Sequence, residues 1–394
     1  MEAYMIFKDL AILILSAKVI GLLMQKIKIP QVVGEILAGL LVGPCLFNWV
    51  QPTDFLAEMS EIGVVLLMFS TGLGTNLKQL IKVGPVALLI ACFGVFIPLV
   101  SGTFLYGAFY GMDAVGTESF YKAVFIGVIL TATSVSITAN VLMEMNKVST
   151  KVGTALIGAA VMDDVIGVIV LTGVLGISTG KGSIGNVLVK TVLFLIFAVV
   201  AGILIYKAAN VYFNKHGRSH RESIFSLALC FGMAFVAEHF FGIADITGAY
   251  LAGLILCSLK DAEYIESKMN VGDYLFFSPI FFASIGLKTS FDGLDKNFLQ
   301  FCICFVAVAL IAKVAGCGLA AKIGGFDWGD SLKIGVGMMT RGEVALVVAS
   351  KGLPAGLVDP IIFTAVIILI LCSSILTPVL LKILYSKEPL ASAD

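Results

Sequence analysis

Two adjacent carboxylates, Asp163 and Asp164, stand in the middle of the apolar run TALIGAAVMDDVIGVIVL. A charged side chain in hydrocarbon is costly unless it faces water or a partner, so such residues usually mark ion or proton pathways. Successive helical positions are about 100° apart, which lets both side chains border one cavity while they face different neighbours. One carboxylate can then bind a cation while the other meets a basic residue. A pair of buried salt bridges is the structural alternative.

A lysine, Lys313, lies deep in a second apolar run, FCICFVAVALIAKVAGCGLAA. At that depth an ammonium group needs a carboxylate partner or loses its proton. The alternative is that its long side chain extends to the nearer membrane surface, which keeps the charged end in water. The residue types alone leave both interpretations open.

Polar segments interrupt two further apolar runs, at 131–138 and at 340–343. Hydroxyl side chains compete with helical hydrogen bonds, and interruptions at corresponding places in two halves of a chain indicate discontinuous helices. Unwound backbone frees carbonyl oxygens for a cation, although the hydroxyl run is also compatible with an unbroken helix. Arg341 and Glu343 flank a glycine, and we expect them to form a structural charge pair. The expected ligands at the first interruption are Thr131, Thr133 and Ser134.

The composition specifies the kind of molecule that must position these residues. Of 394 residues, 59% are hydrophobic and 13% are charged. In soluble domains about 45–50% of the residues are apolar and about 25% are charged, because their surfaces must be polar. The chain is therefore predicted to be an all-α polytopic membrane protein with about thirteen transmembrane helices. Its formal net charge of 0 gives no indication of a nucleic-acid partner.

Charge in the connections predicts the orientation in the membrane. Lys and Arg gather in every second predicted connection, as at Lys147 and Lys151, whereas the alternate connections carry acidic residues such as Asp113 and Glu118. Basic connections stay in the cytoplasm. We therefore expect a multi-pass protein of the cell membrane with its N-terminus outside and its C-terminus in the cytoplasm. That arrangement requires an odd number of spans.

The sequence also contains an internal repeat. The segment GEILAGL at 34–40 matches GAYLAGL at 248–254, and Gly72-Leu73 matches Gly286-Leu287 at the same offset. The offset spans an odd number of predicted helices, so the second copy lies upside down relative to the first. Inverted repeats with two crossed discontinuous helices are typical of secondary transporters. Recurring small residues for close helix packing are the simpler alternative.

Five segments together resemble the cation–proton antiporter superfamily. They are PQVVGEILAGLLVGP at 30–44, TATSVSITANVL at 131–142, the Asp163-Asp164 pair, AKVAG at 312–316 and TRGEVALVVAS at 340–350. The resemblance covers nearly the whole chain and is closest to NapA-type sodium/proton antiporters and Kef potassium systems. Kef systems tend to carry Gln-Asp at the acidic pair, so the Asp-Asp pair favours the NapA-type branch.

The resemblance implies a homodimer in which a scaffold domain holds a mobile core domain that works as an elevator. By matching position, Asp164 resembles the ion-binding carboxylate, Asp163 its neighbour, and Lys313 the core lysine that pairs with Asp163. The implied domains are scaffold at 1–82 and 213–295, core at 83–184 and 296–394, and a linker helix at 185–212.

These observations predict exchange of Na⁺, or Li⁺, for H⁺, with both ions competing for Asp164. No cofactor and no enzyme activity are expected, and the partners are Na⁺, H⁺ and the lipid bilayer. If sodium recruits both carboxylates, Lys313 loses its counter-ion and releases a proton, so the exchange is predicted to be electrogenic. The alternatives are a Kef-type K⁺/H⁺ antiporter, a sodium-coupled organic-anion symporter and a channel. An intramembrane aspartyl protease would need aspartates from two helices.

Overall fold

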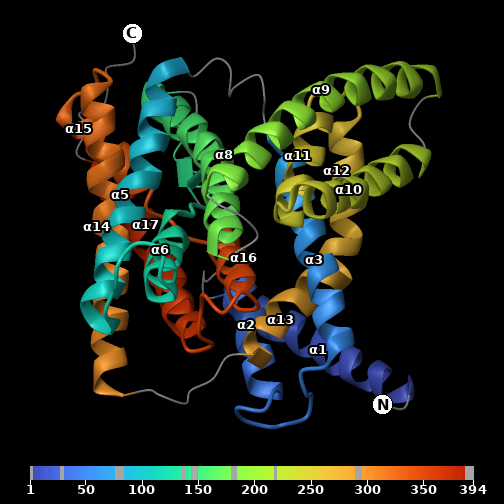
Figure 1. Ribbon diagram of the computed structural model, residues 1–394, viewed down its shortest axis with the longest axis horizontal. Coiled ribbons are helices and arrows are strands. Elements are labelled where there is room, and N and C mark those ends of the chain that lie inside the picture. Colours follow the sequence, from blue (N-terminus) through green and yellow to red (C-terminus); the bar gives the residue numbers. More distant parts are fainter. Residues whose placement is uncertain are drawn as a thin grey trace. The chain divides into compact units, whose positions relative to one another are not determined.

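The computed structural model describes most of the chain, and the elements in the described residues are helices (Figure 1). The described residues are 3–26, 31–75, 84–134, 138–139, 141–142, 145, 147, 150–178, 184–216, 220–288 and 295–386. Seven helical stretches among them are long and apolar enough to cross a membrane. They are Asp54–Leu73, Gly84–Tyr110, Lys151–Ser178, Val192–Val211, Arg221–Phe241, Lys296–Ile323 and Ile362–Ser386. The all-α class is confirmed, and the number of thirteen spans stays a prediction.

The chain divides into two compact units, each built from segments far apart in the sequence. The first unit comprises Met1–Lys78 and Leu175–Ser290. Its helices are α1 (Ala3–Lys26), α2 (Gln31–Val42), α3 (Asp54–Leu73), α9 (Ile184–His216), α10 (His220–Phe241), α11 (Asp245–Leu256), α12 (Ala262–Gly272), the π-helical turn η1 (Asp273–Phe277) and α13 (Ser278–Lys288). Hydroxyl or carboxylate N-caps start several helices of both units, as Thr53 does for α3.

The second unit comprises Gln79–Val174 and Phe291–Asp394. Its helices are α5 (Gly84–Tyr110), α6 (Glu118–Thr131), most of α8 (Lys151–Ser178), α14 (Lys296–Ile323), α15 (Trp328–Gly337), α16 (Glu343–Gly352) and α17 (Ile362–Ser386). Within this unit α5 packs along α14 and α6 packs against α5 (Figure 1).

Glycine contacts in the first unit follow the internal repeat. A Cβ atom on Gly39 of α2 would collide with the backbone of Ala283 in α13, so the two backbones touch there. The repeat partner of Gly39 is Gly253 of α11, and it touches the backbone of Phe69 in α3. Ala283 and Phe69 are themselves separated by the repeat offset. The contact between α2 and α13 therefore has a counterpart, one repeat offset away, in the contact between α3 and α11.

A second pair of glycines behaves in the same way. Gly72 of α3 touches the backbone of Tyr250 in α11, and its repeat partner Gly286 of α13 touches the backbone of Ile36 in α2. Ile36 and Tyr250 again differ by the repeat offset. Four glycine contacts, two at the crossing of α2 with α13 and two at the crossing of α3 with α11, are related in pairs by the repeat. They indicate a pseudo-two-fold arrangement of the two copies, which the simpler explanation of scattered small residues does not predict.

Two helices of the second unit are discontinuous. Helix α6 ends at Thr131, and Ala132 that follows has an extended backbone (φ −55°, ψ 138°). Helix α15 ends at Gly337, and α16 starts at Glu343 after an extended Gly342 (φ −155°, ψ −146°). Both interruptions fall in the polar segments that the sequence singles out, so the prediction of two discontinuous helices is confirmed.

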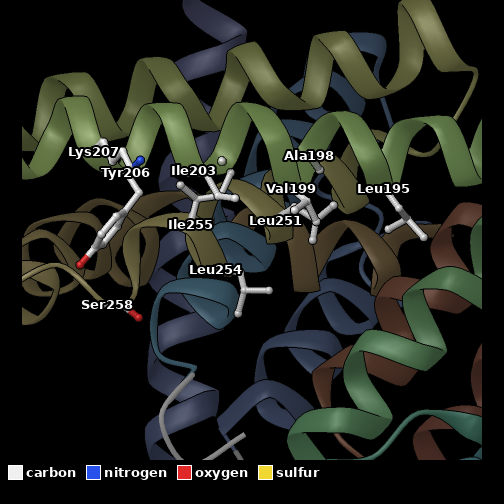
Figure 2. A pocket seen from close by; sticks show the side chains of 11 residues that line it. Leu195, Ala198, Val199, Ile203, Tyr206, Lys207, Leu251, Leu254, Ile255 and Ser258 are labelled. Carbon is white, nitrogen blue, oxygen red and sulfur yellow. The ribbon is translucent and has the colours of Figure 1, made fainter. Parts of the chain in front are cut away.

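Helix α9 contains the predicted linker, and it packs against α10 and α11. An apolar groove of about 530 Å³ lies between α9 and α11, with Lys207, Tyr206 and Ser258 at one end (Figure 2). The helices α12 and α13 form one longer helical stretch that contains the turn η1 between them.

Candidate functional site

A buried ion pair joins two of the predicted residues in the second unit. The Nζ atom of Lys313 in α14 lies 2.7 Å from Oδ1 of Asp163 in α8. Lys313 is 0% exposed and Asp163 is 2% exposed. The side chain of Lys313 therefore points to the interior of the unit, and the alternative in which it extends to a membrane surface is wrong.

The remaining donors of Lys313 are used by backbone carbonyls. Nζ donates to the carbonyl of Gly94 at 2.7 Å and to that of Thr131 at 2.8 Å. An ammonium group has three donors, so these two bonds and the bond to Asp163 saturate it. Lys313 thus ties together α5, the end of α6 and α8. It holds its charge against the C-terminal end of α6, where the helix dipole is negative.

Asp164 follows Asp163 on α8 and is half-buried. Helix α8 passes the end of α6 one turn further on, because a Cβ atom on Gly167 would lie 3.9 Å from Oγ1 of Thr131. The two aspartates are therefore close to the first interruption. Asp163 is committed to Lys313, and Asp164 is the more exposed of the two.

The two interruptions contact each other directly. The amide of Ser134 donates to the carbonyl of Thr340 at 2.9 Å. Oγ1 of Thr138 donates to the carbonyl of Gly337 at 2.7 Å and lies 3.1 Å from Oγ1 of Thr340. A Cβ atom on Gly342 would lie 2.8 Å from Cβ of Ser134. The unwound segments thus cross with their backbones in contact, and Gly342 makes the close approach possible.

Arg341 caps the helix ends at this crossing. Its guanidinium donates to the carbonyls of Leu130 (2.8 Å), Ala309 (3.2 Å), Met339 (3.1 Å) and Met338 (3.4 Å). Leu130 lies in the last turn of α6, and Met338 and Met339 follow α15. Carbonyls at helix ends lack helical partners, and a buried cation satisfies them. The expected charge pair has its arginine in a structural position, and the side chain of Glu343 lies outside the described residues.

The hydroxyls expected as ligands differ in their bonding. Oγ1 of Thr131 donates to the carbonyl of Val128 at 2.8 Å. Oγ1 of Thr133 and Oγ of Ser134 are buried and have no hydrogen-bond partner among the described residues. Buried hydroxyls are normally paired. Thr133 and Ser134 are therefore the better candidates for cation ligands at the break.

Several contributors to the site have no marker in the sequence. The carbonyl of Gly94 binds Lys313, the carbonyl of Thr340 binds the opposite interruption, and Oγ of Ser373 accepts the amide of Arg341 at 3.0 Å. Two of these contributions come from the backbone, which every residue carries. Gly94 has one further property, because a Cβ atom there would lie 2.7 Å from Sγ of Cys317.

Comparisons with known proteins agree with this geometry. The model of the family described as sodium/hydrogen exchanger, transmembrane, matches residues 12–387. The chain is similar to the Na⁺/H⁺–K⁺ antiporter GerN of Bacillus cereus, at 35% identity with 97% of each chain covered. It is also similar to an Na⁺/H⁺ antiporter of Enterococcus hirae, at 33% identity with 97% of this chain and 98% of the relative covered.

Among solved structures, the sodium proton antiporter MjNhaP1 of Methanocaldococcus jannaschii superposes with a TM-score of 0.79 at 18% identity. The superposition covers 98% of this chain and 99% of the other, and it shows a common fold. An inverted repeat with two crossed broken helices is typical of a multi-pass secondary transporter. The comparisons confirm the resemblance to the cation–proton antiporter superfamily. The chain belongs to the sodium/hydrogen exchanger family.

Proposed function

We propose that the protein exchanges Na⁺ for H⁺ and that Asp164 is the shared carrier of both ions. The observation that carries this proposal is the division of labour between adjacent aspartates on α8. Asp163 is tied to Lys313 at 2.7 Å, whereas the half-buried Asp164 precedes by about one turn Gly167, the residue of α8 that approaches Thr131 at the end of α6. Two ions that compete for one carboxylate, exposed alternately to the two sides, couple their fluxes without covalent chemistry.

The cation is held by oxygen atoms, as Na⁺ and Li⁺ require. Asp164 supplies a carboxylate, and Thr133 and Ser134 supply the buried hydroxyls that have no hydrogen-bond partner among the described residues. Thr131 takes part through its carbonyl, which at present accepts from Lys313. Asp163 becomes a second carboxylate ligand when sodium arrives. Na⁺ and H⁺ are cargo in this scheme, and no cofactor takes part.

The saturated state of Lys313 supports electrogenic exchange. When sodium recruits Asp163, the ammonium loses its counter-ion in a dry environment and releases one proton. The resulting amine has two donors, which suffice for the carbonyls of Gly94 and Thr131 once Asp163 has left. A carbonyl oxygen has two lone pairs, so that of Thr131 can serve the amine and the cation together. Together with the proton leaving Asp164, this gives two protons for one sodium.

We further propose that the second unit is the mobile core of an elevator, carrying Asp163, Asp164, Lys313 and both interruptions. The first unit is the scaffold that forms a homodimer, and its glycine crossings suit a rigid frame. The N-terminus lies outside and the C-terminus in the cytoplasm. The relative in Bacillus cereus is named for K⁺ as well as Na⁺, so a K⁺/H⁺ antiporter is the second candidate.

The test is cation-induced proton flux in proteoliposomes that contain wild-type or Asp164→Asn protein, with Na⁺, Li⁺ and K⁺ added separately. Asparagine has the size of aspartate but neither its charge nor its exchangeable proton. We expect flux with Na⁺ in the wild type and loss of at least about 100-fold in the variant, since no charged carrier remains. Glu263→Gln, an exposed carboxylate on α12, is the matched control and should leave flux unchanged. Exchange at the wild-type rate in Asp164→Asn would refute the proposal.

A further inference from the structure

A second group of ionisable side chains lies in the first unit, on helices other than those of the candidate ion site. Nζ of Lys18 in α1 lies 3.1 Å from Oε1 of Glu35 in α2, which is 2% exposed. Gln31 donates to the same oxygen at 2.8 Å. Nζ of Lys18 also lies 3.4 Å from the centroid of the Tyr274 ring. Its charge is thus divided between one carboxylate and one aromatic face.

The second carboxyl group of this region belongs to Asp273, and it lacks the hydrogen-bonded lysine and glutamine partners that Glu35 has. Asp273 opens the π-helical turn η1 and is 7% exposed. Its Oδ1 is buried and has no hydrogen-bond partner among the described residues. Turns of π-helix carry an extra residue and occur frequently at functional sites. Here the turn gives α12 and α13 a buried aspartate at their junction.

The charged groups that act on Asp273 come from two neighbouring helices. Lys18 of α1 and Glu35 of α2 interact with it electrostatically. Helix α3 also packs against η1, but its Glu58 and Glu61 are exposed. On α12, Glu266 is half-buried and paired with Asn270.

The charges of Lys18, Glu35 and Asp273 do not balance when Asp273 is ionised. Lys18 balances Glu35, so an ionised Asp273 would leave one buried negative charge without a counter-ion among the described residues. An isolated carboxylate in such surroundings is strongly unfavourable, and the group is instead neutralised. Since Oδ1 meets no donor from the described chain, the positive charge must come from solution. A cavity of about 480 Å³ lined by Asp273, Asn270 and Ser278 offers the route.

We propose that Asp273 is a second proton-binding site, distinct from Asp163 and Asp164 and located in the other compact unit. In the resting protein its carboxyl carries a proton. At alkaline pH the O–H bond breaks, the proton passes to water in the adjoining cavity, and the negative charge stays on Asp273. The ionised group then competes with Glu35 for Lys18. Proton release therefore weakens the contact between α1 and α2 without touching the transported ions.

The experiment is an infrared pH titration of the full-length Asp164→Asn protein in lipid nanodiscs without sodium. Because that background lacks the proposed carrier, the result does not depend on whether Asp164 transports ions. We expect the carbonyl-stretch band of one buried carboxylic acid, lost at alkaline pH. Adding Asp273→Asn should remove the band, and Asp273→Glu should restore it at a shifted midpoint. Adding Glu263→Gln, an exposed position on α12, should leave it in place.

Two results would overturn the proposal. The first is a band that survives Asp273→Asn, and its removal by Glu35→Gln would then assign it to Glu35. The second comes from repeating the titration with Na⁺ at constant pH. If sodium abolishes the band, the occupant is an alkali cation and not a proton. Asparagine preserves the size and neutrality of the protonated acid, so the variant keeps the packing of the resting state.

Discussion

At the scale of single residues, the candidate site depends on a position that carries no side chain. Gly94 lends its carbonyl to Lys313, and its Cα faces the ion pair at a distance that leaves no room for a methyl group. A Cβ there would lie 2.7 Å from Sγ of Cys317, 3.2 Å from Oδ1 of Asp163 and 3.4 Å from Nζ of Lys313. The geometry of the ion pair between Asp163 and Lys313 thus depends on the lack of a side chain at Gly94 as well as on the two charges.

Gly94→Ala is therefore expected to disturb the pair of Asp163 and Lys313. Overpacking of this kind costs about 1–3 kcal/mol, so the melting temperature in detergent should fall, and proton flux should fall at least about tenfold. Gly173→Ala on α8 is the control, since nothing lies within 4 Å of its added Cβ. Adding Cys317→Ala should restore stability more than flux, because the contacts with the ion pair remain. Full activity in Gly94→Ala alone would contradict this account.

At the scale of elements, Arg341 determines how two broken helices can end inside the protein. It is 0% exposed and satisfies carbonyls of α6, of α14 and of the segment after α15. Without it, the carbonyls of Leu130, Met338 and Met339 would lose the donor that Arg341 supplies. A single side chain thus replaces hydrogen bonds that the interruptions remove from both helices.

Arg341→Met should be among the most destabilising substitutions in the chain. Each buried acceptor left without a donor costs about 1–3 kcal/mol, and several are lost together. Arg341→Lys keeps the charge but not the planar fork of donors, so we expect an intermediate melting temperature. Arg221→Met, at an exposed position in the first turn of α10, should melt like the wild type. Equal melting temperatures for Arg341→Met and Arg221→Met would show that the carbonyls find other donors.

At the scale of the whole molecule, a proton released by Lys313 would make exchange respond to membrane potential. Moving one net charge per cycle couples transport to voltage by about 2.3 kcal/mol per 100 mV. We expect the sodium gradient that reverses proton flux to shift with the imposed potential in wild-type proteoliposomes. Lys313→Gln should abolish exchange or leave a remnant whose reversal ignores voltage. A voltage-independent reversal in the wild type would leave Lys313 with a structural role.

The sequence predicts most of the fold and the charged part of the site for one physical reason. Ionisable residues such as Asp163 and Lys313 are rare in apolar runs, so each stands out as a candidate. The crossing at Thr340 and the support from Gly94 act through backbone groups, which have no signature in residue type. Asp273 is not among the candidates from the sequence, because nothing in the residue types shows that the helix continues through a π-helical turn at this position and buries the carboxyl group.

The glycine crossings of the first unit have a mechanical consequence. Where Gly39 and Gly286 let backbones touch, no rotamer is frozen when the contact forms, so it costs little side-chain entropy. For the same reason no rotamer is available at these positions to absorb a displacement, so a shift of α2 acts directly on the backbone of α13. We therefore expect α2 and α13 to move as one body.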